Sequence, residues 1–214
     1  MNETELIRVF IALVMLGTAS YYDVRAREVN DLLWIVFGAA GAFLYVFDMH
    51  SFSIVTVISV GLGLFVAFLC WVLRLCGEAD VLSLITLSVI LPSYEQVPVT
   101  MVVLVIASIM AFSYALTNNF YRNLKSLITN RKLFTDMDEP FYKKLAAFFL
   151  IHKRNENDEY KFSAETIIEG KRKFVFRHEP NSEMFGAANY VTTTLPLMPF
   201  LLVSLAFFIM ISLF

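Results

Sequence analysis

The sequence predicts an all-α polytopic membrane protein with six transmembrane helices and a small soluble α/β insertion before the last helix. Three observations predict this class. First, 58% of the 214 residues are hydrophobic and 17% are charged, whereas soluble domains are about half apolar and a quarter charged. Second, the apolar residues gather in long runs, and crossing the hydrocarbon core takes about 20 of them. Third, thirteen of the seventeen Lys and Arg residues lie in one polar segment, 118–194.

Six apolar runs are candidates for membrane-spanning helices. They divide the chain into a membrane domain with five helices (1–117), the insertion (118–194) and the sixth helix (195–214). The fourth run is too short to cross, so its helix should begin near Gly77 or extend past Pro92. Asn30 and Asp31 should cap the second helix. The runs are about Leu6–Tyr22, Leu32–Phe47, Phe52–Leu75, Val81–Pro92, Val97–Leu116 and Leu195–Phe214.

The distribution of basic residues predicts the orientation in the membrane. The loops around 48–51 and 93–96 carry no Lys or Arg, whereas the alternate loops do. Short cytoplasmic loops are enriched in these residues. We therefore expect a multi-pass protein of the cell membrane with three cytoplasmic loops and both termini outside. The basic residues nearest to helix ends are Arg25, Arg27, Arg74, Arg122 and Lys125.

The insertion contains two recognisable patterns. "PFYKKLAAFFLIHKR" (140–154) places Phe141, Leu145, Phe148 and Phe149 at helical spacing opposite lysines. This pattern is typical of an amphipathic helix that lies on the bilayer surface. "EYKFSAETI" and "KRKFVFRH", separated by Glu169–Gly170, alternate polar and apolar residues and favour a β-hairpin.

Composition also argues against several kinds of partner and cofactor. The net charge of −2 provides no basic field for nucleic acid. Two cysteines, Cys70 and Cys76, supply neither a disulfide framework nor a zinc site, and the three histidines are scattered. We expect no metal and no cofactor. The glycine pairs 38/41 and 61/63 are most simply positions of close helix packing.

Two acidic residues fall at membrane boundaries that the predicted topology places on the same side. Asp23 ends the first apolar run, and Asp80 precedes the fourth. Two carboxylates that approach closely share one proton. The ionised member can then activate water while the protonated one polarises a carbonyl, which is peptide hydrolysis without a metal. The alternative is structural: Asp23 ends the first helix, and Asp80 is the N-cap of the fourth.

The sequence motifs around these two acids resemble those of a known protease family. "DVRAREVND" from Asp23 and "GEAD" from Gly77 are similar to the two motifs of GxGD-type intramembrane aspartic proteases. The best match is the archaeal preflagellin peptidase, a relative of type IV prepilin peptidases. The resemblance covers roughly residues 1–117 and implies six membrane helices, with Asp23 and Asp80 as the catalytic pair. Gly77, Glu78 and Ala79 complete the second motif, although Ala79 stands where the signature has a second glycine.

The resemblance also implies the substrate. It would be a precursor protein with a short basic leader ahead of a hydrophobic helix, cut on the cytoplasmic side, and Glu78 is an acidic group toward which that leader would be drawn. A presenilin or signal-peptide-peptidase relative is an alternative because of "YYD", but only "LPLMP" (195–199) stands near where that family has Pro-Ala-Leu. The non-enzyme alternative is a small proton-coupled transporter that uses interfacial aspartates. Carriers usually place such acids near the midplane, commonly within inverted repeats.

Overall fold

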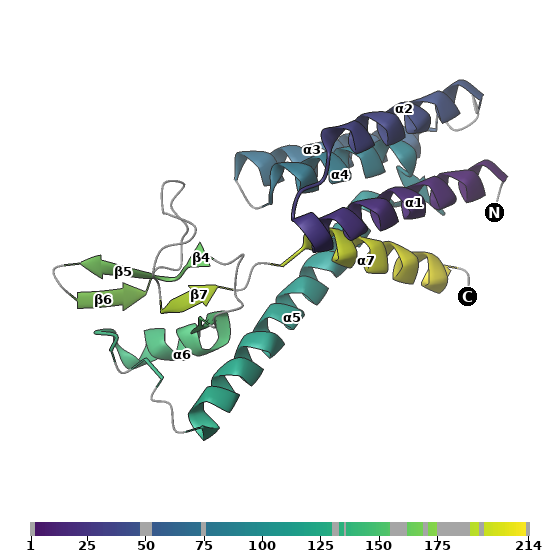
Figure 1. Ribbon diagram of the computed structural model, residues 1–214. Coiled ribbons are helices and arrows are strands. Elements are labelled where there is room, and N and C mark those ends of the chain that lie inside the picture. Colours follow the sequence, from purple (N-terminus) through teal and green to yellow (C-terminus); the bar gives the residue numbers. More distant parts are fainter. Residues whose placement is uncertain are drawn as a thin grey trace. The chain divides into compact units, whose positions relative to one another are not determined.

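The chain forms two compact units in a computed structural model (Figure 1). The first unit comprises Met1–Met110 and Pro196–Phe214, and the second comprises Ala111–Leu195. The described residues are 3–47, 53–73, 76–129, 133–134, 136–154, 162–168, 171–174, 189–192 and 195–212.

The first unit consists mainly of helices, and each of the six predicted runs overlaps one of them. The helix α5 begins in the first unit and continues into the second. By length and composition α1, α3 and α5 can each cross a membrane, while α2 and α7 are shorter apolar helices. A mainly helical structure with three helices that can span a membrane is therefore confirmed, and the six crossings stay a prediction. The helices are α1 (Glu3–Ala26), α2 (Asp31–Phe47), α3 (Ile54–Val72), α4 (Glu78–Ile90), α5 (Val99–Ile128) and α7 (Leu197–Ser212).

Local sequence signals explain where these helices begin. The Asn30 Oδ1 atom accepts the N–H of Leu32 at 2.9 Å, so the predicted cap of α2 is confirmed. α4 begins at Glu78, which decides between the two predicted extensions of the short fourth run. After α4 the chain forms a small hairpin of β1 (Ser93–Tyr94) and β2 (Val97–Pro98). Its two turn residues have φ of 49° and 65°, as a type I′ turn requires.

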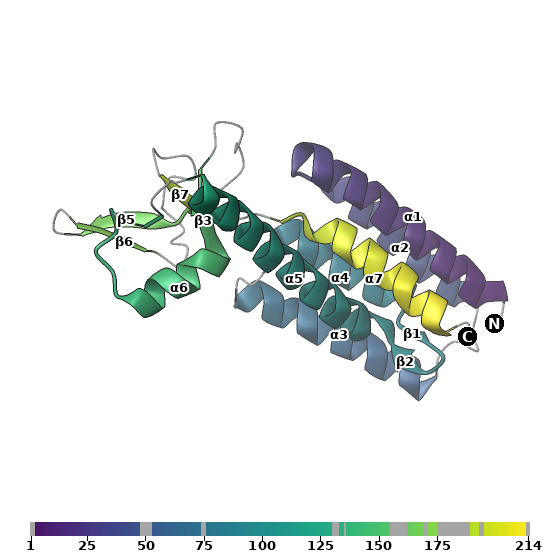
Figure 2. The same ribbon diagram turned by 90° about the horizontal axis from the view of Figure 1, so that it is seen from below.

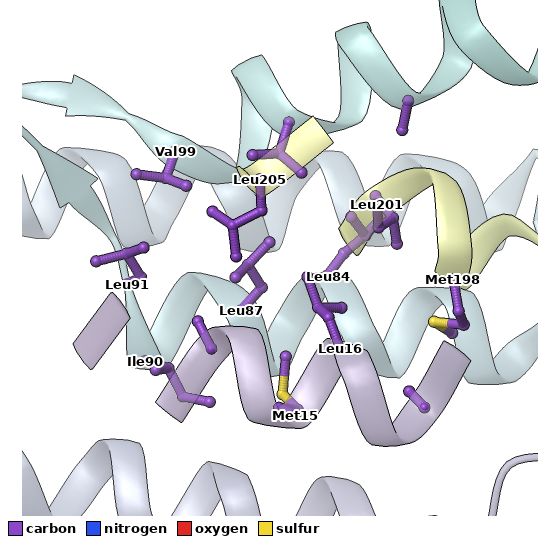
Figure 3. Packing of buried hydrophobic residues seen from close by; sticks show 14 of the residues in the cluster. Met15, Leu16, Leu84, Leu87, Ile90, Leu91, Val99, Met198, Leu201 and Leu205 are labelled. Carbon is purple, nitrogen blue, oxygen red and sulfur yellow. The ribbon is translucent and has the colours of Figure 1, made fainter. Parts of the chain in front are cut away.

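α4 is the helix around which the first unit packs. It contacts α1, α2 and α3, and its side chains Leu84, Leu87 and Ile90 are fully buried. Figure 3 shows Leu84 and Leu87 beside residues of α1 and α7. A hydroxyl group of α4 is satisfied within this environment: Ser88 Oγ donates to the Leu84 carbonyl at 2.6 Å and lies 3.0 Å from the Thr100 hydroxyl oxygen. α4 can therefore be shorter than a typical membrane span and still be fixed on several sides.

Close packing against α4 depends on two of the four predicted glycines. A Cβ on Gly41 would lie 2.8 Å from Ile90 Cγ1 and 3.1 Å from Ile90 Cα. A Cβ on Gly63 would lie 2.8 Å from Ser88 Cβ. These distances confirm a close approach of α2 and α3 to α4. The prediction is wrong for Gly61, which faces open space.

α7 packs along α1, and Figures 1 and 2 show the two helices side by side. The buried side chains Leu16 and Ala19 of α1 and Leu201 and Leu205 of α7 belong to one hydrophobic cluster. The last helix of the chain is thereby held against the first.

The second unit combines the later part of α5 with α6 (Phe141–Leu150) and short strands. β5 (Glu165–Ile168) pairs antiparallel with β6 (Lys171–Phe174), which confirms the predicted hairpin, whereas its turn at 169–170 lies outside the described residues. A three-stranded antiparallel sheet has the order β3-β7-β4. Its strands are β3 (Ile151–Lys153), β4 (Phe162–Ser163) and β7 (Tyr190–Thr192).

The amphipathic helix is shorter than the pattern over 140–154 indicates, because α6 ends at Leu150 and the next three residues form β3. Asn123 of α5 accounts for this end. Its Nδ2 atom donates to the carbonyls of Phe148 and Ile151, each at 2.7 Å. Phe141 is 81% exposed, as predicted for a surface-seeking face, but Phe148 packs toward the core of the unit.

Candidate active site

Asp23 lies in the last turn of α1. The helix continues for three residues beyond it to Ala26, so Asp23 does not end the helix. Its Oδ2 atom accepts the backbone N–H of Met198 at 3.2 Å. Met198 is the second residue of α7, where backbone N–H groups have no partner within the helix. The carboxylate of the first helix is thus held by the N-terminus of the last.

Asp80 lies in the first turn of α4, and its Oδ2 atom accepts the N–H of Gly77 at 3.1 Å. Asp80 therefore does cap the helix, although from its third residue rather than from the N-cap position. Gly77 is the N-cap, with φ −68° and ψ 164°, a conformation that any residue adopts. A sharp turn is therefore not the reason for a glycine here. A Cβ would lie 3.5 Å from Asp80 Oδ2, so glycine leaves that oxygen open.

The structure brings the two predicted acids to the same end of the first unit. α1 and α4 are packed together, with Asp23 in the last turn of α1 and Asp80 in the first turn of α4. Arg25, two residues beyond Asp23, donates from Nη1 to the Tyr21 hydroxyl at 2.6 Å. Two carboxylates that come close at such a helix boundary can hold one proton between them.

A cavity of about 570 Å³ lies beside the second motif. Trp71 and Val72 of α3 line it together with Cys76, Gly77 and Glu78. Neither aspartate is among these lining residues. The cavity combines apolar surface with one exposed acid, so it suits an apolar segment that carries a positive charge. Within the described ranges, no group of three or more His, Cys, Asp or Glu side chains comes together to hold a metal ion.

The sequence does not predict the roles of two further residues, Met198 in the site and Arg8 at a distance from it. The contact of Met198 with Asp23 has one sequence signal, because Pro196 and Pro199 mark a helix start. The second residue is Arg8. It is buried within α1, donates from Nη1 to the Ile90 carbonyl at 3.0 Å, and lies 4.3 Å from the centre of the Tyr45 ring. Arg8 therefore fastens α1 to the opposite end of the helix that carries Asp80.

Comparison with known families gives one match. The model of the type IV leader peptidase family matches residues 10–116, which include Asp23 and the segment 77–80. No curated protein and no solved structure matches the chain. The matched residues are half of the chain and contain α2, α3 and α4 in full. The protein therefore belongs to the type IV leader peptidase family, a family of proteases that act on precursor proteins.

Proposed function

We propose that the protein is a membrane aspartic endopeptidase that removes short basic leader peptides from preflagellin or type IV pilin-like precursors on the cytoplasmic side. The observation that carries the proposal is the placement of two carboxylates, Asp23 in the last turn of α1 and Asp80 in the first turn of α4, on helices that pack against each other. Family membership supports the reaction class. The motif words "DVRAREVND" and "GEAD" support the preflagellin branch.

In the proposed reaction the two aspartates share one proton. The ionised carboxylate takes a proton from a water molecule as the water oxygen attacks the scissile carbonyl carbon. The protonated carboxyl donates a hydrogen bond to the carbonyl oxygen, where negative charge develops. When the C–N bond breaks, a carboxyl returns a proton to the departing nitrogen. The pair is then restored with one proton, and no covalent enzyme intermediate is formed.

Each carboxylate is also held by a backbone N–H, from Met198 for Asp23 and from Gly77 for Asp80. These bonds orient the two acids before substrate arrives. Both amides lie at helix N-termini, whose positive dipole ends favour negative charge. Substrate that contacts both helices would favour the arrangement in which the carboxyls share one water molecule.

The cavity beside Glu78 supports the proposed substrate class. Its apolar residues Trp71 and Val72 suit the hydrophobic segment of a precursor, and Glu78 suits the basic leader that precedes it. Glu78 is exposed and adjacent in sequence to the motif, so it can attract a positive charge without being buried. We propose that Glu78 contributes to leader recognition and not to the bond-breaking step.

The experiment that tests the proposal is cleavage of a preflagellin-type precursor by purified enzyme in detergent. Asp23→Asn and Asp80→Asn should each abolish cleavage, because neither carboxyl can act alone. Asp31→Asn is the matched control, since it removes the same charge from an exposed residue at the start of α2. EDTA should have no effect. Near-normal cleavage by either active-site variant would refute the catalytic pair, and loss of proton flux without loss of cleavage would favour a transporter.

A further inference from the structure

The second unit contains a basic cavity that the proposed reaction does not use. Its volume is about 550 Å³, and it lies between the polar end of α5 and the strand β3. The described lining includes three cationic side chains and no acidic one. Hydroxyl and amide side chains complete it, so the cavity offers both positive charge and hydrogen-bond donors. Its lining includes Arg122, Lys125, Lys153, Asn118, Ser126 and Thr129.

If α5 crosses the bilayer, its length places the cavity near the lipid headgroups. α5 has 30 residues, so it is about 45 Å long, whereas the hydrocarbon core is about 30 Å thick. Its first part, 99–116, is mainly apolar and contains no charged residue, and the first charged residue of α5 is Arg122. Tyr114 and Tyr121 are both more than half exposed near this transition, where membrane interfaces are enriched in tyrosine. Arg122 and Lys125 follow within the next two turns.

The wall of the cavity formed by β3 is fixed by hydrogen bonds. Asn119 Nδ2 donates to the Phe149 carbonyl at 3.1 Å, and Asn119 Oδ1 is 2.9 Å from His152 Nδ1. Asn123 Nδ2 binds the Ile151 carbonyl at 2.7 Å. Asn119, Asn123 and His152 are almost completely buried. Lys153 directly follows the buried His152. The hydrogen bonds of β3 therefore keep the Lys153 side chain at the same cavity as Arg122 and Lys125 of α5.

We propose that this cavity binds the phosphate of an anionic phospholipid headgroup and thereby ties the second unit to the bilayer. A phosphate can accept hydrogen bonds from Arg122 and from the two lysines at once. Anionic lipids attract basic residues near a membrane surface. The exposed apolar residues of α6, with Phe141 as the most exposed, can enter the same interface. The assignment does not depend on the chemistry of the two aspartates.

Native mass spectrometry of the full-length protein in detergent tests the proposal. The wild type should retain phosphatidylglycerol in preference to phosphatidylcholine. Loss of one cation should weaken retention roughly fivefold, and loss of all three on the order of a hundredfold. The variants are Lys125→Gln alone and the triple variant Arg122→Gln, Lys125→Gln, Lys153→Gln. Lys173→Gln, on β6 of the same unit, is the control and should retain the lipid as the wild type does.

Two further measurements keep the result independent of folding. Lys125→Arg preserves the charge and should bind like the wild type. Inorganic phosphate, added to the wild type alone, should bind more weakly than phosphatidylglycerol because it lacks the acyl chains that the bilayer holds. Equal retention of both lipids by the wild type, or full retention by a folded triple variant, would overturn the proposal. Inorganic phosphate that binds as tightly as the lipid would assign the cavity to a soluble anion.

Discussion

Gly41→Ala should loosen the contact between α2 and α4 that positions Asp80. The added Cβ would lie 2.8 Å from Ile90 Cγ1, 3.1 Å from Ile90 Cα and 3.3 Å from its backbone nitrogen. A side-chain rotation cannot relieve the last two contacts, since they involve backbone atoms. α4 must therefore move away from α2. The same movement would strain the hydrogen bond that the Ile90 carbonyl accepts from Arg8.

The magnitude follows from two opposing effects. Overpacking a closely packed interior costs about 1–3 kcal/mol. Replacing glycine by alanine within a helix contributes about 0.8–1.0 kcal/mol in the opposite direction. Gly61→Ala is the matched control because a Cβ there meets nothing within 4 Å. The helix-propensity contribution is the same in both variants. The difference between them should therefore be about 1–3 kcal/mol, with Gly41→Ala the less stable.

Thermal unfolding of both variants in one detergent measures this difference. At about 2–4 °C per kcal/mol for a chain of this size, Gly41→Ala should unfold several degrees below Gly61→Ala. Its cleavage activity should also fall, because Asp80 moves with α4. Equal unfolding temperatures for the two variants would refute the close approach of α2 to α4.

Three other predictions concern the leader, the second unit and the topology. Glu78→Lys should lower kcat/KM for a basic leader roughly two- to thirtyfold, because charge reversal loses an attraction of about 0.2–1 kcal/mol and adds a repulsion of the same size. An acidic leader should restore cleavage by this variant. Equal loss of cleavage with both leaders would contradict a role of Glu78 in leader recognition. Tyr190→Phe removes the O–H that donates to Asp136 at 3.0 Å and should cost about 1–3 kcal/mol in urea unfolding. Burial raises the pKa of Tyr190 from 10.0 to about 12. The stability that the Tyr190 hydroxyl contributes should therefore be lost in the wild type, and not in Tyr190→Phe, as the pH rises from 10 through 12. An equal loss of stability in the variant over this pH range would exclude Tyr190 as the cause. In intact cells a cysteine at Glu95 should be labelled from outside and one at Arg27 should not, and the opposite result would reverse the topology.

Hydropathy predicts the helices of the first unit well because burial in lipid or in a core requires apolar side chains along most of a helix. It misplaces the start of α4, since Glu78 and Asp80 are polar and the apolar run begins only at Val81. Acids in a first helical turn are stabilised by the helix dipole, so polar residues can belong to the helix. The GEAD motif therefore marks the boundary better than the hydrophobic run does.

The candidate site was predictable only in part. The sequence motifs around Asp23 and Asp80 and the alternation of basic loops predict that the two residues lie on the same side of the membrane. Both signals lie within the first four helices. The contact of Asp23 with Met198 joins residues from the two ends of the chain. No periodicity encodes such a contact, since it arises from the packing of α7 against α1. The strands β3 and β7 have three residues each, which is too short for an alternating pattern to reveal them.

The most direct test of the account is the non-additivity of the two aspartates. Single-turnover cleavage of one precursor should be measured for Asp23→Asn, Asp80→Asn and the double variant. If the carboxyls act as one catalytic unit, each single variant loses nearly all of the catalysed rate, and the double variant loses no more. Single variants with partial activity whose losses multiply in the double variant would show that the two residues act independently, which would contradict a shared-proton mechanism.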